Sequence, residues 1–258
     1  MDLSLKGKVA IVTGGSRGIG RNISLRLAEE GCPVAICGRS ADDLRATADE
    51  LRSHGVSVMT SVTDVAEPGA VEHFVEEAAA SLGAVDLLVA NVGGSAGAGL
   101  LESTLEEWKR TFDLNLFHAV GAIHAAVPHM QQRAGGSVLI VSSISGWKPV
   151  NRRAQYATAK AAAIHLAHSL ALELAPHRIR VNALSPGSTL FEGGSWARFR
   201  DAEPEAFAQF EREEFPWGRL ATPQEIADVG VFLLSERARW INGANIPVDG
   251  AQRSPSAW

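Results

Sequence analysis

The segment Val9-Ala-Ile-Val-Thr-Gly14-Gly-Ser-Arg-Gly18-Ile-Gly20 joins an apolar run to a glycine-rich turn. Its first five residues are mostly β-branched and lack polar alternation, as in a strand buried on both faces of a sheet. An amphipathic helix follows. Glycines permit a tight turn and close backbone approach, and a helix N-terminus offers free N–H groups to a pyrophosphate. We therefore expect a dinucleotide at this turn; a glycine-rich turn without a ligand is the alternative.

Strands and helices continue to alternate along the rest of the chain. Six further strands are expected at Val34–Cys37, Val56–Val62, Val85–Ala90, Ser137–Val141, Arg180–Leu184 and Ala244–Val248. The main later helices are expected at Ala41–His54, Pro68–Leu82, Leu105–Met130, Tyr156–Ala175 and Pro223–Ser235. This alternation predicts an α/β fold of the Rossmann type, a doubly wound three-layer αβα sandwich around a seven-stranded parallel sheet.

The length of 258 residues suits one domain over residues 1–258, without repeats or a linker of low complexity. Only Ser188–Phe215 reads as a long irregular insert, rich in polar and aromatic residues. Loops of that length in compact domains tend to be lids or binding loops. We expect this segment to be a lid on the substrate side.

Composition excludes several classes of function. The net charge is −5 and no basic run of five residues exists, which disfavours binding to nucleic acid or to anionic membranes. The N-terminal residues lack the apolar core of a signal peptide, and no run of ~18 apolar residues could span a membrane. Cys32 and Cys37 lie too close along one extended segment to bridge easily, so buried thiols in a cytoplasmic protein are expected. The eight histidines show no metal-ligand spacing, and no metal is predicted.

The residues after the second strand bear on the choice of dinucleotide. An acidic residue there would bind a ribose 2′-hydroxyl, whereas an arginine accommodates a 2′-phosphate. The chain has Gly38 and then Arg39, with Arg17 in the glycine turn and no carboxylate at the strand end. Two guanidinium groups can pair with a phosphate dianion. NADP(H) is therefore favoured over NAD(H), unless Arg39 is only a solvated loop charge.

Tyr156 and Lys160 are four positions apart on a predicted helix and so share one face. A nearby ammonium favours the phenolate and lowers the pKa of a tyrosine toward neutrality. A tyrosine tuned in this way can act as a general acid or base. Taken alone, the pair is equally typical of a helix surface.

Together these features resemble the short-chain dehydrogenase/reductase family in its ~250-residue form, and are similar to 3-oxoacyl-acyl-carrier-protein reductases. The interval of 13 positions from Ser143 to Tyr156 fits that family. The matching residues run in order through nearly the whole chain: Thr13–Gly20, Asp64-Val65, Asn91-Val-Gly93, Asn115, Ser143, Tyr156-x-x-x-Lys160 and Pro186-Gly187.

The resemblance implies a catalytic set of Asn115, Ser143, Tyr156 and Lys160. Ser143 would bind the substrate oxygen, and Tyr156 would transfer its proton. Lys160 would lower the pKa of Tyr156 and bind the nicotinamide ribose, while Asn115 would hold a water of a proton relay. Without the resemblance, Ser143 reads as a strand-end turn serine and Asn115 as a polar residue inside a helix.

The resemblance also implies a set of cofactor contacts. Asp64 would contact the adenine and Asn91 would line the adenosine ribose. Two departures from the family pattern affect this set, because one asparagine is missing beside Asn91 and the threonine after Pro-Gly stands early, at Thr189. The implied contacts are Gly14, Ser16, Arg17, Gly18, Ile19, Gly20, Arg39, Asp64, Val65, Asn91, Gly93, Tyr156, Lys160, Pro186, Gly187 and Thr189.

Three segments should form the substrate walls, namely Gly93–Leu100, Ser145–Gln155 and Ser188–Phe215. They combine aromatic side chains with Lys148, Arg152 and Arg153, which would suit an apolar ketone bearing an acidic group or an acyl thioester on an acidic carrier. An exposed arginine pair and aromatic residues that pack the lid onto the body are the alternative. The candidate substrate contacts are Ser145, Trp147, Arg153, Phe191 and Trp196.

The resulting functional expectation is an NADPH-dependent oxidoreductase that reduces a ketone or 3-oxoacyl carbonyl of a small molecule to a hydroxyl. An alcohol or polyol dehydrogenase that acts oxidatively with NAD(P) is the alternative in the same class. A catalytically silent nucleotide-binding protein is the alternative in another class. The long helix and the Tyr156 helix carry more small and apolar residues than one sheet needs, which suggests a homotetramer or homodimer.

Overall fold

The computed structural model describes residues 2–254. Its strands are β1 (Ala10–Val12), β2 (Val34–Gly38), β3 (Val58–Val62), β4 (Leu87–Ala90), β5 (Gly136–Val141), β6 (Ile179–Pro186) and β7 (Asn245–Val248). They form one parallel sheet in the order β3-β2-β1-β4-β5-β6-β7. The chain winds outward from β1 to β3 and then returns to the other side of β1, so β1 and β4 flank the point where the winding reverses. Ligands of such sheets bind at that point, outside the carboxyl ends of the strands.

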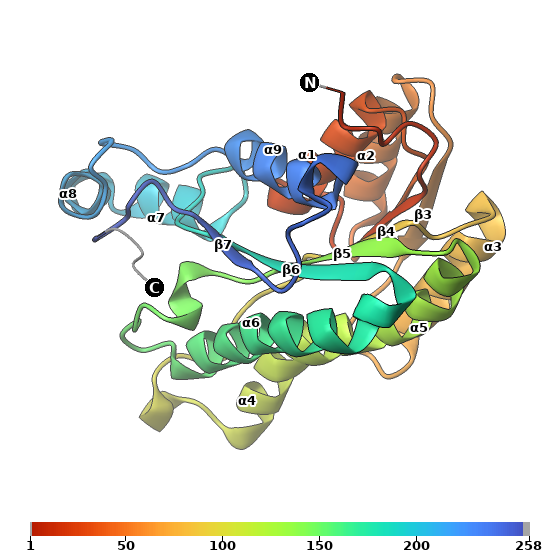
Figure 1. Cartoon of the computed structure of the whole chain (residues 1–258). Helices are drawn as coiled ribbons and strands as arrows, with labels where there is room; N and C mark the ends of the chain where they lie inside the picture. The colour runs from red at the N-terminus through yellow and green to blue at the C-terminus, as the bar shows by residue number, and fades with distance from the viewer. Residues whose placement is uncertain (1, 255–258) are drawn as a thin grey trace.

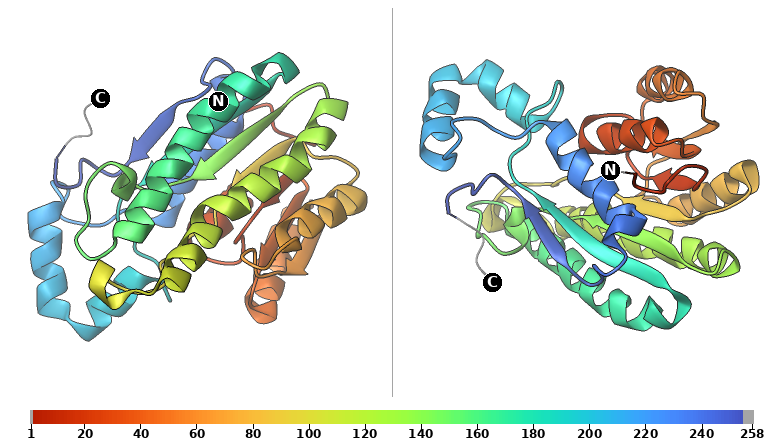
Figure 2. Two further views of the ribbon diagram at one scale, coloured as in Figure 1. Left: turned by 90° about the horizontal axis from the view of Figure 1, so that it is seen from below. Right: turned by 45° about the horizontal axis from the view of Figure 1, so that its top comes forward.

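Helices cover both faces of the sheet (Figure 1). One face carries α1 (Gly18–Glu29), α2 (Ala41–Arg52) and α9 (Pro223–Leu234). The other carries α3 (Ala70–Leu82), α5 (His118–Gln132) and α6 (Ala154–Leu174), which follow one another across the sheet in the view from below (Figure 2). The predicted three-layer αβα sandwich with a seven-stranded parallel sheet is confirmed.

The core follows from the strand sequences. Every residue of β1 and of β4 is buried, because each strand is covered on both faces. Alternate residues therefore enter two different cores: Ile11 and Leu88 pack with α3, α5 and α6, whereas Val12 and Val89 pack with α1 and α9. This double burial explains why the strands read as uninterrupted apolar runs.

Local side-chain bonds fix where several helices begin. Thr104 caps α4 (Leu105–Phe112) by accepting from the Glu107 N–H, and the Glu107 carboxylate accepts in return from the Thr104 N–H. Thr222 and Glu225 make the same reciprocal pair at the start of α9. Such capping boxes satisfy N–H groups that the first helical turn leaves free.

The helix predicted over Leu105–Met130 is present but not uniform. It consists of α4, a π-helical turn at Asp113–Phe117 and α5, which continues to Gln132. A π-helical turn is rare and is found frequently at functional sites. No spacing of apolar residues distinguishes it from an α-helix, so the sequence could not indicate it.

The interpretation of Ser188–Phe215 as an irregular segment is wrong. It contains two helices, α7 (Ser195–Ala202) and α8 (Pro204–Glu214), which project together at one end of the sheet (Figure 1). Pro204 occupies the first turn of α8, where a missing N–H costs nothing. The aromatic side chains of this segment pack mainly on one another, which gives it a small core of its own.

The two cysteines are buried, as the sequence predicts. Cys32 and Cys37 are both free and buried, and burial raises the pKa of each thiol to about 12. Within residues 2–254, no helix is both long and apolar enough to cross a membrane.

Candidate active site

The glycine turn lies at the carboxyl end of β1, beside the end of β4. Gly14 and Gly18 have φ values of +65° and +57°, which favour glycine. At Gly20, a β carbon would stand 2.3 Å from the Gly14 carbonyl oxygen and 2.4 Å from Nδ2 of Asn91. The turn is therefore compatible only with glycine at Gly20, because both neighbours belong to the turn's own hydrogen-bond network.

Asn91 holds this turn together. Its Nδ2 donates to the carbonyls of Thr13 at 3.0 Å and Gly14 at 3.2 Å, and its N–H donates to the Thr13 hydroxyl at 2.9 Å. The side-chain amide expected to line the adenosine ribose thus binds the main chain that precedes α1. Helix α1 itself has no side-chain cap and no acidic residue in its first turn, so Gly18, Ile19 and Gly20 begin it at a terminus suited to an anion.

The ends of β2 and β3 bring Arg39 close enough to Asp64 for its charge to act on that carboxylate. Arg17 and Arg39 are exposed, and neither makes an ion pair within residues 2–254. Asp64 follows β3 and is bound by Arg110, with Nη2 2.6 Å from Oδ2. Burial alone would raise the pKa of Asp64, but its hydrogen bonds and the charges of Arg110 and Arg39 hold that pKa below its ordinary value.

Two further members of the predicted cofactor set are buried at the same edge. Ser16 lies at the end of the glycine turn, and its hydroxyl would stand 2.7 Å from a β carbon on Gly38. Val65 follows Asp64 and joins the core beneath β2. Ser16 and Val65 are therefore buried, whereas Arg39, which follows Gly38, is exposed.

Lys160 is anchored beneath the end of β5. Its Nζ donates to the Val141 carbonyl at 2.8 Å, and its own carbonyl accepts from the Ser142 hydroxyl at 2.8 Å. The side chain is buried, and this burial lowers the pKa of Lys160 to about 7. Nζ lies 5.8 Å from the centre of the Tyr156 ring. The sequence-predicted pair on one face of a helix is thus brought together.

The pKa of Tyr156 does not move in the expected direction. Burial raises it, while the Ser143 hydroxyl and the charge of Arg153 act in the opposite sense and only partly compensate. Burial therefore has the larger effect on the pKa of Tyr156. The sequence argument that Lys160 lowers the pKa of Tyr156 is therefore not met in this structure.

Asn115 lies on the π-helical turn and faces the same region. Its Nδ2 donates to the carbonyls of Gly94 and Thr111, both at 2.6 Å, and its Oδ1 accepts from the Gly94 N–H at 3.2 Å. A β carbon on Gly93 would stand 3.0 Å from both Oδ1 of Asn115 and Nζ of Lys160. The side chains of Asn115 and Lys160 therefore both lie against Gly93.

Ser143 begins a short 3₁₀ turn after β5. Its Oγ accepts from the Ser145 N–H at 3.1 Å and donates to the Ser145 hydroxyl at 3.2 Å. The local turn bond that a strand-end serine typically makes is present. The same hydroxyl also lies close enough to Tyr156 to favour its phenolate.

The segment after β6 is held from two sides. A β carbon on Gly187 would stand 2.9 Å from Asp249, which follows β7. The Thr189 hydroxyl donates to the Gly187 carbonyl at 3.2 Å and is nearly buried, while Pro186 ends β6. Thr189 therefore uses its hydroxyl within its own turn.

The cations expected to meet an acidic substrate are largely occupied. Lys148 Nζ binds Asp249 Oδ2 at 2.9 Å and the carbonyls of Gln252 and Ser254 at 2.7 and 2.8 Å. Arg152 pairs with Glu102 at 2.8 Å on the surface. Their neighbour Arg153 is exposed, and its charge acts on Tyr156. Of the three cations, only Arg153 keeps a geometry compatible with the expected role.

The three aromatic candidates for substrate contact lie in different surroundings. Trp147 packs against the core of α5 and α6, next to Ser145 on the loop after β5. Trp196 stacks on Phe210 inside the aromatic cluster of Ser188–Phe215, with ring centres 4.7 Å apart. Phe191 stands apart from that cluster and lies against Gly18 of the glycine turn.

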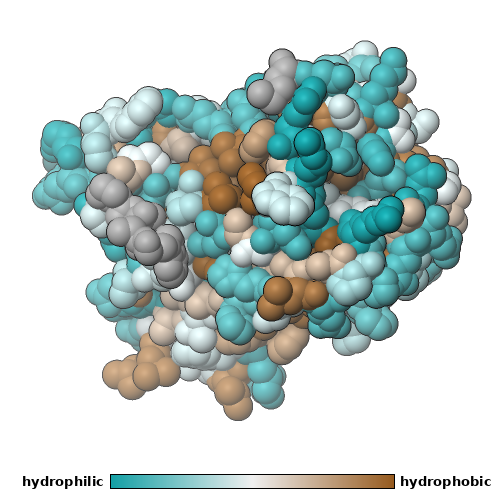
Figure 3. Space-filling model, in the orientation of Figure 1, coloured by the Kyte–Doolittle hydropathy of each residue, from teal (hydrophilic) through white to brown (hydrophobic). Residues whose placement is uncertain are grey.

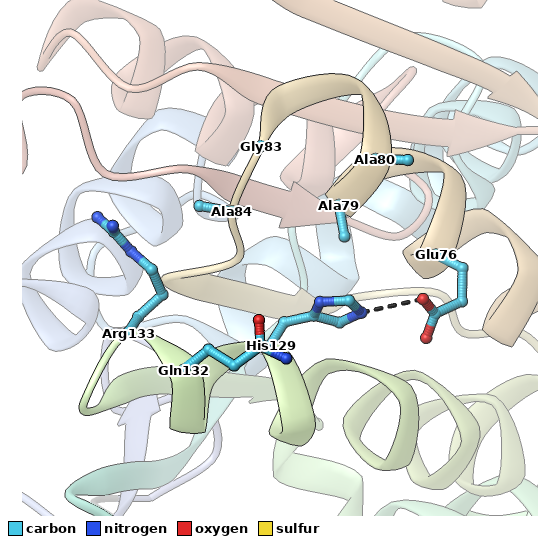
Figure 4. Close-up of a pocket in the computed structure, with 8 residues that line it drawn as sticks. All are labelled: Glu76, Ala79, Ala80, Gly83, Ala84, His129, Gln132 and Arg133. Carbon is cyan, nitrogen blue, oxygen red and sulfur yellow. Dashed lines mark hydrogen bonds and ion pairs between the residues drawn. The ribbon is translucent and has the colours of Figure 1, made fainter.

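A hollow of about 290 Å³ lies away from these residues, between the ends of α3 and α5 (Figure 4). Its lining includes Gly83, Arg133 and the pair Glu76–His129, whose Oε2 and Nε2 are 3.0 Å apart. Gly83 precedes β4, so the hollow opens at the amino end of the strand. It therefore lies at the edge of the sheet opposite to the glycine turn.

Several residues at the site were missed from the sequence. Arg110 binds Asp64 across 46 positions, and no local spacing announces such a partner. His118 is buried one turn after Asn115, close enough to Lys160 for the charge of that lysine to act on it, and burial lowers the pKa of His118 to about 3. The sequence could have indicated His118, because this histidine stands three positions after Asn115 on an otherwise apolar helical face.

The chain matches the family model described as short chain dehydrogenase over residues 8–195. Among solved structures, L-sorbose reductase from Gluconobacter frateurii in complex with NADPH and L-sorbose has a TM-score of 0.92 and 33% sequence identity, with 99% of this chain and 100% of that chain covered. The 3-oxoacyl-acyl-carrier-protein reductase from Agrobacterium tumefaciens with NADP bound has a TM-score of 0.90 and 30% identity, with 96% and 95% covered.

A third similar structure contains the other nicotinamide dinucleotide. The 7α-hydroxysteroid dehydrogenase in complex with NADH and 7-oxoglycochenodeoxycholic acid has a TM-score of 0.90 and 29% identity, with 98% of this chain and 97% of that chain covered. All three agree with the fold described above. The chain therefore belongs to the short-chain dehydrogenase/reductase family and is an oxidoreductase that acts on CH–OH and C=O groups.

Proposed function

We propose that this protein reduces a ketone or 3-oxoacyl carbonyl to a hydroxyl with NADPH, and that Tyr156 donates the proton. One observation carries the proposal: Asn115, Ser143, Tyr156 and Lys160 come from three separate elements and converge beside Gly93. A protein that only binds nucleotides has no need for a buried lysine next to a partly buried tyrosine and serine.

Each member of this set has a distinct task in the proposed reaction. The Ser143 hydroxyl binds the substrate oxygen, and the Tyr156 phenol gives it a proton. NADPH, when bound, supplies the hydride to the carbonyl carbon. Lys160 is held in place by the Val141 carbonyl, which leaves further N–H groups for a ribose hydroxyl. Asn115 is fixed by Gly94 and Thr111 and keeps the π-helical turn in position.

A raised pKa suits Tyr156 for donation. A phenol that stays protonated at neutral pH is available as an acid at the moment when charge develops on the substrate oxygen. The Ser143 hydroxyl and the Arg153 charge stabilise the phenolate that remains after the transfer.

The residues at the glycine turn fit a dinucleotide. Gly14, Gly18 and Gly20 carry no side chain of their own at the uncapped start of α1, which lets phosphates approach its N–H groups. Arg17 and Arg39 are exposed and make no ion pair within residues 2–254, which leaves both guanidinium groups available for a 2′-phosphate. This availability supports NADP(H) over NAD(H) in our proposal.

The remaining predicted contacts complete the proposed cofactor site. Asp64 and Val65 lie beneath the adenosine end and Asn91 orders the glycine turn, while Pro186, Gly187 and Thr189 border the nicotinamide end. Ser145 and Arg153 are the best-placed candidates for substrate contact, because Ser145 touches Ser143 and Arg153 lies beside Tyr156. We take residues 1–258 as a single domain and the segment 188–215, from here called the lid, as its substrate-side cover.

Exposed apolar side chains support a homotetramer or homodimer. Phe117 and Val120 project from the start of α5, and Leu172 projects from α6 with 82% of its surface exposed. Apolar atoms also protrude at the lower edge of the molecule, where α4 begins (Figure 3), and Leu101 and Leu105 are exposed there. Contact between the α5–α6 faces of two subunits would remove much of this surface from water.

A substrate screen tests the proposal. Purified protein is offered ketones, 3-oxoacyl thioesters and the corresponding alcohols, and absorbance reports the consumption or formation of NADPH and NADH. We expect faster reduction with NADPH than oxidation of any alcohol at neutral pH. Turnover confined to alcohols would favour the oxidative alternative, and failure of both dinucleotides to raise Tm would contradict the cofactor site.

Arg39→Gln tests the choice of dinucleotide. We expect the Kd for NADPH to rise about tenfold, equivalent to ~1.4 kcal/mol, and the Kd for NADH to stay unchanged. Arg45→Gln is the matched control, because Arg45 is an exposed arginine on α2 that pairs with Asp42. Equal effects of the two substitutions on NADPH binding would contradict the role of Arg39.

A further inference from the structure

The aromatic side chains of the lid fall into two groups. Trp196, Phe199, Phe207, Phe210 and Phe215 form the cluster that packs α7 against α8. Phe191 is not part of this cluster. Its ring faces the body of the protein and meets the phosphate-binding turn.

The contact with that turn is close and depends on a glycine. A β carbon on Gly18 would stand 2.8 Å from Cζ, 2.9 Å from Cε2 and 3.2 Å from Cε1 of Phe191. Gly18 is also the first residue of α1 and has a φ of +57°. The ring therefore lies directly on the backbone that begins the uncapped helix.

The position of Phe191 is fixed on both sides along the chain. Before it, the Leu190 N–H donates to the Ala221 carbonyl at 2.9 Å and the Ala221 N–H donates to the Ser188 carbonyl at 3.1 Å. After it, the Phe191 carbonyl accepts from the Gly194 N–H at 3.1 Å and closes a tight turn. A β carbon on Gly194 would also stand 3.1 Å from the ring. The ring is thus held between the lid and the body.

We propose that the Phe191 ring latches the lid onto the phosphate-binding turn and thereby slows the release of the dinucleotide. This inference rests on the proposed function, since it concerns the same cofactor site. Phosphates bound at the start of α1 would have to pass the ring as they leave, so the lid must lift from Gly18 before release. Phe191 is then a positioning residue for the cofactor, and the substrate contact expected for it from the sequence is not its main role.

The latch differs from a substrate wall in what it changes. Removal of a substrate wall would raise KM for the carbonyl compound and leave the dinucleotide unaffected. Removal of the latch would speed the release of NADPH in the absence of any substrate. A merely structural role in the lid would instead lower Tm and leave the rate of NADPH release unchanged.

The test measures NADPH release by stopped-flow fluorescence, with excess NADP⁺ as the displacing ligand and no substrate present. For Phe191→Ala we expect release about tenfold faster than in the wild type, equivalent to ~1.4 kcal/mol, with Tm unchanged. Phe191→Tyr keeps the ring and should release NADPH at the wild-type rate. Trp217→Ala is the matched control, because Trp217 is an exposed aromatic residue just after the lid and should leave the rate unchanged.

Two outcomes would overturn the inference while leaving the proposed function intact. One is wild-type release in Phe191→Ala, and the other is an equal increase in Phe191→Ala and Trp217→Ala. If the first outcome comes with a lowered Tm in Phe191→Ala, Phe191 has a structural role instead. If the wild type binds neither NADPH nor NADH, the proposed function and the latch both fail.

Discussion

The cofactor side and the substrate side of the site are built in different ways. The cofactor side uses glycines and main-chain bonds, with Asn91 tying Thr13 and Gly14 over short distances. The substrate side uses long side chains, such as Lys148, that reach across the fold to Asp249 and the C-terminal segment. The backbone geometry of the glycine turn suits a dinucleotide phosphate whatever the substrate is. Side-chain contacts such as those of Lys148 can be changed one at a time. Under the proposed function, a change of substrate would alter the side-chain contacts and leave the glycine turn intact.

The largest expected effect breaks the cofactor side. Gly20→Ala forces a β carbon into the Gly14 carbonyl and Asn91, and we expect a loss of about 3 kcal/mol, since neither neighbour can yield without opening the turn. Tm should fall by roughly 6–12 °C for a domain of this size, and NADPH should no longer raise it.

Gly193→Ala is the control on the lid. A β carbon there meets no atom within 4 Å, although its φ of +70° disfavours alanine by about 1 kcal/mol. If Gly20→Ala and Gly193→Ala lost the same stability and both still bound NADPH, the close contacts of Gly20 would not be essential for the cofactor site.

A smaller effect is expected when the substrate side is broken at Lys148. Lys148→Met removes a nearly buried ion pair with Asp249, and we expect a loss of about 2 kcal/mol. Thermal unfolding measures it. NADPH should still raise Tm in this variant, because Lys148 does not reach the glycine turn.

Arg152→Met is the matched control for Lys148. The Arg152–Glu102 pair is exposed on both sides, so its loss should change stability by less than about 1 kcal/mol. Equal losses in the two variants would mean that the C-terminal segment does not hold the substrate loop through Lys148.

A further effect is a change in pH dependence at Lys160, where the two sides meet. Because burial lowers the pKa of Lys160 from 10.5 to about 7, the charged form is disfavoured in the folded state. This penalty is fully present below about pH 7 and disappears as the pH rises toward 10.5, so it makes the wild type more stable with rising pH. Neighbouring His118 stays neutral throughout, since its pKa is about 3.

Lys160→Met removes that titration. The Tm of the variant relative to the wild type should be highest near pH 6.5 and should decrease toward pH 9.5, by roughly 2–4 °C for each kcal/mol of the penalty. A difference in Tm that does not depend on pH would show that Lys160 is not held in a desolvated state.

The sequence predicted the features that depend on neighbours along the chain. The run from Val9 to Gly20 specifies a strand, a turn and a helix within 12 residues, and the four-residue step from Tyr156 to Lys160 places both on one helical face. The order of strands and helices then followed from alternation alone. These features are confirmed because local spacing and helical or strand geometry leave few other outcomes.

The features that the sequence could not predict depend on distant partners. Lys148 meets Asp249 across 101 positions, and Phe191 meets Gly18 only because the lid folds back onto the first turn. The pKa of Tyr156 was expected to fall through charge, but burial, which no spacing reveals, raises it. The helices of segment 188–215 could not be predicted from the sequence. Their aromatic residues pack on one another and not on the main core.

The most direct test of the proposed chemistry is the turnover of Tyr156→Phe on any ketone that the wild type reduces. The substitution keeps the ring and removes only the hydroxyl, so Tm should be unchanged and NADPH should still raise it. We expect kcat to fall by about 100-fold or more, the contribution typical of a general acid. A kcat within tenfold of the wild type would contradict the assignment of Tyr156 as the proton donor.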